Sequence, residues 1–136
     1  MEHEKIVRNW LELADKDLAL AKHAAKTMYP VPYEIICFHC QQFAEKYLKG
    51  FLVSRGLEPP NIHDLVKLVY LCENEKPEFG KIKQKCVVLT QYGVQPRYPG
   101  GMQINEEDMN RALNFAEEFM VFIKEKVPEL FYENTQ

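Results

Sequence analysis

Apolar side chains recur at steps of three and four residues along most of this chain, which is the spacing of one face of an α-helix. Proline or glycine interrupts the pattern between helices, and no segment alternates as a strand does. The pattern therefore predicts an all-α protein, an up-down bundle of four to five helices. We expect the helices over about residues 4–27, 33–55, 63–73, 79–92 and 105–127.

Residues that favour helix ends mark several of these boundaries. The segment 29–32 (Tyr-Pro-Val-Pro) ends the first helix, because proline blocks its continuation. So short a connection makes the first two helices antiparallel. Gly56 suits the left-handed position that follows a helix. We expect Asn61 to cap the third helix, with Asp64 in its first turn, and Asn105 to cap the last.

The predicted helix over residues 33–55 has two faces that differ from those of an ordinary surface helix. One face is apolar and carries Ile36, Cys40, Phe43, Ala44, Tyr47 and Phe51. The roughly opposite stripe mixes apolar and polar groups, namely Ile35, Phe38, His39, Gln42, Lys46 and Lys49. A solvated face would lack the isoleucine and the phenylalanine. We interpret this helix as central, with one face in the core and the other against a helix or partner around a polar site.

Composition is that of an ordinary soluble globular protein. The chain has 136 residues, of which 46% are hydrophobic and 27% charged. We expect one domain over 1–136, with a core of about 4–126 and a tail over 127–136. The formal net charge of −3 gives no overall field toward nucleic acid, although a local basic patch is compatible with it. No apolar run reaches the ~20 residues of a membrane span, and the N-terminus lacks a signal-peptide core, so we expect a cytoplasmic protein.

Four cysteines raise the question of a metal site. Cys37 and Cys40 share a helix face and could reach one ion, but a structural zinc site needs two further ligands. His63, Cys72 and Cys86 do not form a second ligand pair. We therefore expect the thiols to be buried as small hydrophobic groups, with no metal and no other cofactor. The alternative is metal or redox chemistry at residues 37–40.

Side chains that suit a phosphate group occur on the mixed stripe and beyond it. Lysine and arginine supply positive charge, and histidine, glutamine and tyrosine supply hydrogen bonds or stacking surfaces. The candidate nucleotide- or RNA-phosphate-binding residues are His39, Gln42, Lys46, Lys49, His63, Arg97 and Tyr98. Of these, His63 would add a donor near the start of the third helix, where backbone amides favour anions.

A structural interpretation of the same residues stays open. In it, Lys46 pairs with Glu45 or neighbouring acids, and Gln42 and His39 fill a helix interface. Asp17 lies close to the apolar stripe of the first helix. It is either a solvated flank or local cap, or the partner of a basic residue in the site.

Four stretches together resemble the HEPN domain family in its short, stand-alone prokaryotic form. They are Trp10 with Ala14, Asp17-Leu18 and Ala21; the run Phe38 to Lys49; His63-Asp64-Leu65; and Arg97-Tyr98-Pro99. The resemblance spans about residues 4–126. It implies a four-to-five-helix bundle that pairs as a homodimer and is associated with a small nucleotidyltransferase. Some members resemble metal-independent endoribonucleases that place an arginine, and a histidine four to six residues later, at the dimer cleft.

This sequence departs from that arginine–histidine motif. No histidine follows Arg97, the next histidine after Arg8 is His23, and neither His39 nor His63 has an arginine four to seven residues before it. The leading hypothesis is therefore a dimeric module that binds a nucleotide or RNA phosphate. It would act with a nucleotidyltransferase partner in a toxin–antitoxin-like or defence system. The alternatives are an endoribonuclease that uses His39 or His63 instead, and a purely structural dimerisation domain.

Overall fold

The computed structural model of this protein describes residues 2–93 and 103–132, and all regular structure within them is helical. This confirms the all-α prediction. In chain order the elements are α1 (Glu2–Thr27), α2 (Tyr33–Ser54), α3 (Leu65–Glu75), η1 (Pro77–Ile82), α4 (Lys83–Leu89), η2 (Thr90–Tyr92), α5 (Glu106–Lys126) and α6 (Glu129–Tyr132), where η marks a 3-10 helix.

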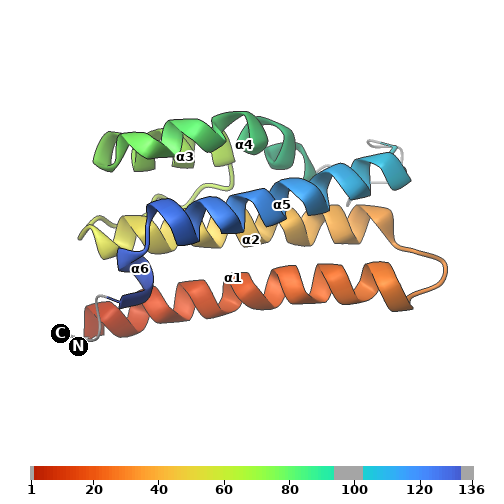
Figure 1. Ribbon diagram of the computed structural model, residues 1–136, viewed down its shortest axis with the longest axis horizontal. Coiled ribbons are helices and arrows are strands. Elements are labelled where there is room, and N and C mark those ends of the chain that lie inside the picture. Colours follow the sequence, from red (N-terminus) through yellow and green to blue (C-terminus); the bar gives the residue numbers. More distant parts are fainter. Residues whose placement is uncertain (1, 94–102, 133–136) are drawn as a thin grey trace.

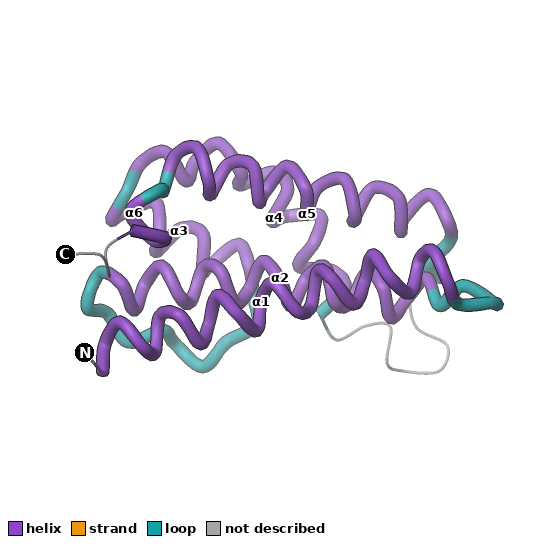
Figure 2. Tube along the Cα trace, turned by 60° about the horizontal axis from the view of Figure 1, so that its bottom comes forward, coloured by secondary structure: helices purple, strands orange, loops and turns teal. Residues whose placement is uncertain are grey.

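Helix α2 is the central helix of the bundle, as the sequence predicted. It packs against α1, α3, α4 and α5. In Figure 1, α1 lies along one side of α2 and the α3–α4 pair lies on the other, while α5 runs along α2. Figure 2 shows that α1 and α2 run antiparallel and are joined by a short loop at one end of the bundle. Helix α2 is therefore enclosed by neighbouring helices over most of its surface.

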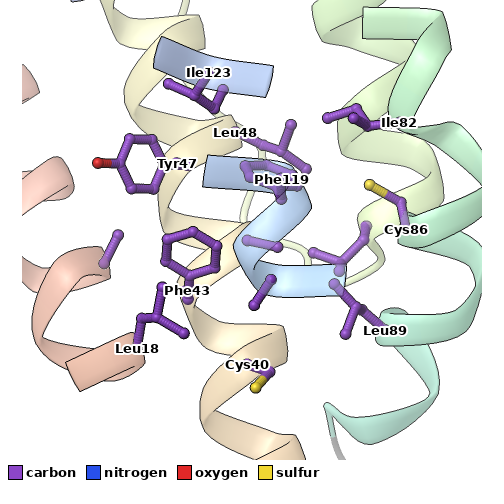
Figure 3. Packing of buried hydrophobic residues seen from close by; sticks show 14 of the residues in the cluster. Leu18, Cys40, Phe43, Tyr47, Leu48, Ile82, Cys86, Leu89, Phe119 and Ile123 are labelled. Carbon is purple, nitrogen blue, oxygen red and sulfur yellow. The ribbon is translucent and has the colours of Figure 1, made fainter. Parts of the chain in front are cut away.

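Aromatic rings fill the core between α2 and α5 (Figure 3). The Phe43 and Tyr47 rings of α2 lie 5.5 and 6.3 Å from the Phe119 ring of α5, centroid to centroid. The Phe51 ring lies 4.6 Å from that of Phe79 in η1. All five residues are fully buried, and burial of such a side chain contributes about 1.5–3 kcal/mol. The apolar face predicted for residues 33–55 is thus confirmed.

Two of the predicted helix ends are confirmed by their backbone geometry. The Asn105 side chain accepts from the amide of Asp108 at 3.0 Å, while the Asp108 carboxylate accepts from the amide of Asn105 at 3.0 Å. This capping box satisfies backbone donors that the helix itself leaves without partners. Gly56 follows α2 with φ of 79°, a left-handed conformation that glycine adopts without strain.

The start predicted for the third helix is wrong by two residues. Helix α3 begins at Leu65, and its cap is Asp64, not Asn61. The Asp64 carboxylate accepts from the amides of Val66 and Lys67, so the chain turns into the helix at Asp64. His63 consequently lies before the helix.

The predicted helix over 79–92 is divided into three pieces: η1, α4 and η2. Pro77 begins η1, which passes very close to α3. A Cβ atom added at Gly80 would lie 2.6 Å from Oε2 of Glu73. The tighter 3-10 turns are therefore part of how this segment packs onto α3, which the apolar spacing alone does not reveal.

Candidate functional site

The polar side chains of the mixed stripe gather around two buried carboxylates. In the first group, His39 Nδ1 lies 2.8 Å from Oδ1 of Asp17, and Lys46 Nζ lies 2.5 Å from Oδ2. The Asp17 side chain is 10% exposed, and those of His39 and Lys46 are 22% exposed. We call these three residues the Asp17 cluster. It joins α1 to α2, with its carboxylate covered and its two basic groups at the edge of solvent.

The second group is built around Glu45 of α2. Lys49 Nζ donates to Oε2 at 3.0 Å, His63 Nδ1 lies 2.9 Å from the same oxygen, and Gln41 Nε2 donates to Oε1 at 3.1 Å. We call Glu45, Lys49, His63 and Gln41 the Glu45 cluster. The Glu45 and Lys49 side chains are only 6% and 7% exposed, whereas that of His63 is 61% exposed. The cluster thus has a buried ion pair and one exposed histidine.

The protonation of Glu45 is set by two opposing effects. Burial alone would raise the pKa of its carboxyl group, because the charged form loses hydration. Hydrogen bonds from His63, Lys49 and Gln41, together with the positive charge of Lys49, outweigh burial and hold the pKa below its usual value. Glu45 is therefore ionised at neutral pH and compensates the charge of the buried Lys49 ammonium.

Both clusters repeat one arrangement: a carboxylate that binds a histidine through Nδ1 and a lysine through Nζ. Because Nδ1 is engaged, Nε2 is the ring nitrogen left to meet a ligand. In a neutral ring that donates from Nδ1, Nε2 accepts a proton or a hydrogen bond; in a protonated ring it donates. Each cluster can therefore either remove a proton from a bound group or donate a hydrogen bond to one.

Gln41 connects the second cluster to neighbouring segments. Its Nε2 also donates to the backbone carbonyl of His63 at 3.0 Å, and its Oε1 accepts from Gln42 Nε2 at 2.9 Å. The buried Gly93 lies directly on it, since a Cβ there would be 3.3 Å from Gln41 Nε2. A single buried glutamine thus bonds α2 to the segment before α3 and lies close to Gly93, the residue after η2.

The structure changes the interpretation of the candidate lysines. Lys46 pairs with Asp17 and not with Glu45, and Lys49 is the lysine that pairs with Glu45. Asp17, left open between a solvated flank and an ionic partner, is the partner of both His39 and Lys46. Each lysine is therefore largely neutralised, and neither is a free point charge for phosphate.

Backbone amides at the start of α3 are likewise already bonded. The Asp64 carboxylate accepts from Val66 and Lys67, and Thr90 Oγ1 accepts from the amide of Leu65 at 2.9 Å. An anion next to His63 would therefore not use these amides, contrary to our expectation.

The structure brings five of the seven candidate residues into these networks: His39, Gln42, Lys46, Lys49 and His63. Arg97 and Tyr98 lie outside the described residues. Sequence reasoning missed Gln41 and the central place of Glu45. The signal was present, because Gln41, Glu45 and Lys49 follow one another at steps of four, the spacing of side chains that meet on a helix.

Comparison with known proteins places the chain in a family. Residues 7–126, most of the chain, match the HEPN domain. The chain belongs to the HEPN domain family. Two solved structures are similar to this HEPN domain. TT1696 from Thermus thermophilus shares 27% identity over 88% of this chain and 97% of that chain, with a TM-score of 0.69. ST0689, an archaeal HEPN homologue, shares 28% identity over 89% of this chain and 97% of that chain, with a TM-score of 0.68. No curated protein matches this HEPN domain.

Three further observations concern the chemistry open to this HEPN domain. All four cysteines are fully buried, as predicted, and burial raises the pKa of each thiol, which keeps it protonated. Among the described residues, histidine, cysteine and acidic side chains form no group of three or more that could hold a metal ion. In the same part of the chain, no helix is both long and apolar enough to cross a membrane.

Proposed function

We propose that this HEPN domain is a dimeric binding module that holds phosphate groups of a nucleotide or RNA, one at the Nε2 edge of His39 and another at that of His63. In this proposal it acts with a nucleotidyltransferase partner in a toxin–antitoxin-like or defence system. The observation that carries the proposal is the carboxylate–histidine–lysine arrangement that occurs twice around α2, once with Asp17 of α1 and once with His63 from the segment before α3. HEPN domains commonly dimerise, which supports the dimeric part.

The net charge of each cluster indicates that its histidine is the residue that controls anion binding. In each cluster one carboxylate offsets one lysine, so the cluster is neutral when its histidine is neutral and carries one positive charge when the histidine is protonated. Lys46 adds hydrogen-bond donors beside the histidine, because its ammonium has three N–H groups and Asp17 accepts from one of them. A phosphate would therefore bind beside a cluster without displacing the carboxylate.

Calorimetric titration tests this site with ATP, GTP, UTP and a short RNA, at a pH near 6 and again near 8. We expect His39→Ala and His63→Ala each to weaken binding roughly tenfold or more, as loss of a charge-assisted hydrogen bond does. His23→Ala is the matched control, because His23 is exposed on α1 and lies outside both clusters. Equal affinity in all three variants, or no binding by the unmodified protein, would contradict the proposal.

RNA cleavage is a second candidate, favoured by the same pair of histidines. A histidine held through Nδ1 by a carboxylate, with Nε2 open, has the geometry of a group that takes the proton of an attacking hydroxyl. Incubation with end-labelled RNA in the presence of a metal chelator distinguishes an RNA-cleaving enzyme from a binding module. Cleavage that is lost in His39→Ala or His63→Ala but kept in His23→Ala supports an enzyme; intact RNA that is nevertheless bound supports a binding module.

The partner is tested apart from the site. Co-expression with the product of the adjacent gene, followed by purification through a tag on one chain, should recover both chains if that product is the nucleotidyltransferase. A purely structural dimer predicts instead that no nucleotide changes the melting temperature and that Lys46→Glu separates the copies. Failure of co-purification would remove the partner from the proposal and leave the phosphate site to be judged by titration.

A further inference from the structure

Gln42 lies between the two clusters and belongs to neither of them. It stands on α2 three residues after His39 and four before Lys46, so helical spacing places its side chain beside theirs. Its carboxamide turns toward the Glu45 cluster, where Nε2 donates to Oε1 of Gln41 at 2.9 Å. A neutral, half-buried amide is therefore located between the two proposed phosphate positions.

The orientation of the Gln41 amide is fixed by the two groups that it faces. Gln41 Nε2 lies 3.1 Å from Oε1 of Glu45 and 3.0 Å from the backbone oxygen of His63. Both oxygens can only accept, because Glu45 is ionised and a backbone carbonyl carries no proton. Only an NH₂ group can face two acceptors, so the side-chain oxygen of Gln41 points away from them, toward Gln42.

The orientation of Gln41 in turn fixes that of Gln42. The Gln41 oxygen accepts only, so the end of the Gln42 amide that faces it is the NH₂ group. The other end of that amide is its oxygen, and within the described residues no group donates to it. Nor is this oxygen among the buried, unpaired atoms of that part of the chain, so it reaches solvent. Gln42 thus presents a hydrogen-bond acceptor beside His39 and Lys46.

We propose that Gln42 is a specificity-determining residue of the phosphate site, and that it selects ligands with a hydrogen-bond donor, a hydroxyl or amino group, next to their phosphates. Phosphate oxygens are acceptors, so a ligand made of phosphate alone uses His39 and Lys46 but gains nothing from the Gln42 oxygen. A nucleotide offers both kinds of group, because a ribose hydroxyl or a base amine can donate to Gln42 while the phosphates accept from the basic residues. The site should therefore prefer a nucleotide to inorganic polyphosphate.

This inference rests on the proposed function and narrows the ligand of the same site. A hydrogen bond between neutral groups contributes about threefold to tenfold in affinity, and only for the ligand that makes it. The competing interpretation is that Gln42 merely fills the surface of α2. In that case its replacement would change the affinity for every ligand alike, so the ratio of two affinities separates the two interpretations.

Calorimetric titration with ATP, 2′-deoxy-ATP and inorganic tripolyphosphate measures this ratio. We expect the unmodified protein to bind ATP more tightly than tripolyphosphate. Gln42→Met keeps the length of the side chain and removes its acceptor, so it should lower that preference by about threefold to tenfold. Gln84→Met is the matched control and should leave the preference unchanged, because Gln84 is exposed on α4 and lies outside both clusters.

The deoxy nucleotide identifies the donor. If the unmodified protein prefers ATP to 2′-deoxy-ATP and Gln42→Met does not, the donor is the 2′-hydroxyl. If the two nucleotides bind alike but both lose their advantage over tripolyphosphate in Gln42→Met, the donor is another hydroxyl or the base amine. Either result supports the selection by Gln42.

Gln41→Met tests the orientation separately. It leaves Gln42 in place and removes the oxygen that fixes it, so the preference for ATP should fall here too; if circular dichroism shows this variant unfolded, Gln42→Met decides alone. An equal loss for all three ligands in Gln42→Met, or a preference that survives it, would overturn this inference and leave the phosphate site standing. An unmodified protein that binds tripolyphosphate as tightly as ATP would do the same. Binding of none of the three ligands would overturn the proposed function as well.

Discussion

Glu45→Gln is the substitution that most directly tests how the buried cluster stabilises the fold. The change keeps the shape of the side chain and removes its charge. Lys49 would then keep a buried ammonium, 7% exposed, without its carboxylate. Removing one partner of a buried ion pair costs about 3–5 kcal/mol, because the remaining charge stays desolvated. Since domains of this kind are stable by only about 5–15 kcal/mol, the loss should be a large part of the total.

Urea unfolding followed by circular dichroism measures this loss as a change in the free energy of unfolding. The matched control is Glu118→Gln, which removes the carboxylate of an exposed pair: Lys85 Nζ lies 3.4 Å from Glu118, whose side chain is 58% exposed. An exposed pair contributes about 0–1 kcal/mol. We therefore expect Glu45→Gln to be destabilising by several times more than Glu118→Gln.

A second substitution identifies the cause of the loss. Lys49 Nζ lies 5.9 Å from the centre of the Trp10 ring, so an apolar side chain at position 49 would remain packed. Replacement of a buried ion pair by well-packed hydrophobic residues is often neutral or stabilising, and the Glu45→Gln, Lys49→Met variant likewise leaves no buried charge without its partner. We therefore expect that adding Lys49→Met to the Glu45→Gln variant will restore most of the stability that Glu45→Gln removes. The reasoning is refuted if Glu45→Gln costs less than about 1 kcal/mol, or if the double variant is no more stable than the single one.

The effect of Glu45 should also depend on pH in one direction. The folded-state pKa of Glu45 lies below 4.5, its ordinary value. Its stabilising contribution is therefore complete above 4.5 and is lost as the pH falls through the lower, folded-state value. The stability difference between the unmodified protein and Glu45→Gln should shrink on acidification below that point. A difference that grows there would contradict the hydrogen-bonded carboxylate described above.

Two further substitutions test the core and a helix cap. Phe119→Ala should lower the free energy of unfolding by about 3–5 kcal/mol, because it removes the ring that Phe43 and Tyr47 contact and leaves a cavity. Urea unfolding measures this loss. A loss under about 1 kcal/mol would show that the surrounding side chains fill the cavity or that the ring is not packed as described. Asn105→Ala should cost about 1 kcal/mol in the same assay, since the amide of Asp108 loses its acceptor, whereas no change would mean that water replaces the cap.

Part of the candidate site could be predicted because it depends on one helix. The positions of His39, Gln42, Lys46 and Lys49 on a common stripe follow from helical spacing, and so does the pairing of Glu45 with Lys49. The same periodicity could not show that Lys46 would be neutralised. Its partner, Asp17, lies 29 residues away in the sequence and belongs to another helix.

Local sequence by itself determined the long helices α1, α2 and α5, the antiparallel start, the cap at Asn105 and the buried face of α2, because each depends on neighbours within about one helical turn. Only the tertiary structure decided which basic residues Asp17 meets. That choice depends on how α1 lies along α2, where Gly50 allows a close approach: a Cβ atom there would lie 3.1 Å from Trp10 Cβ and from Leu11 Cδ2. Fixed at that contact, the helices bring Asp17 to His39 and Lys46, and Glu45 is left to Lys49 and His63.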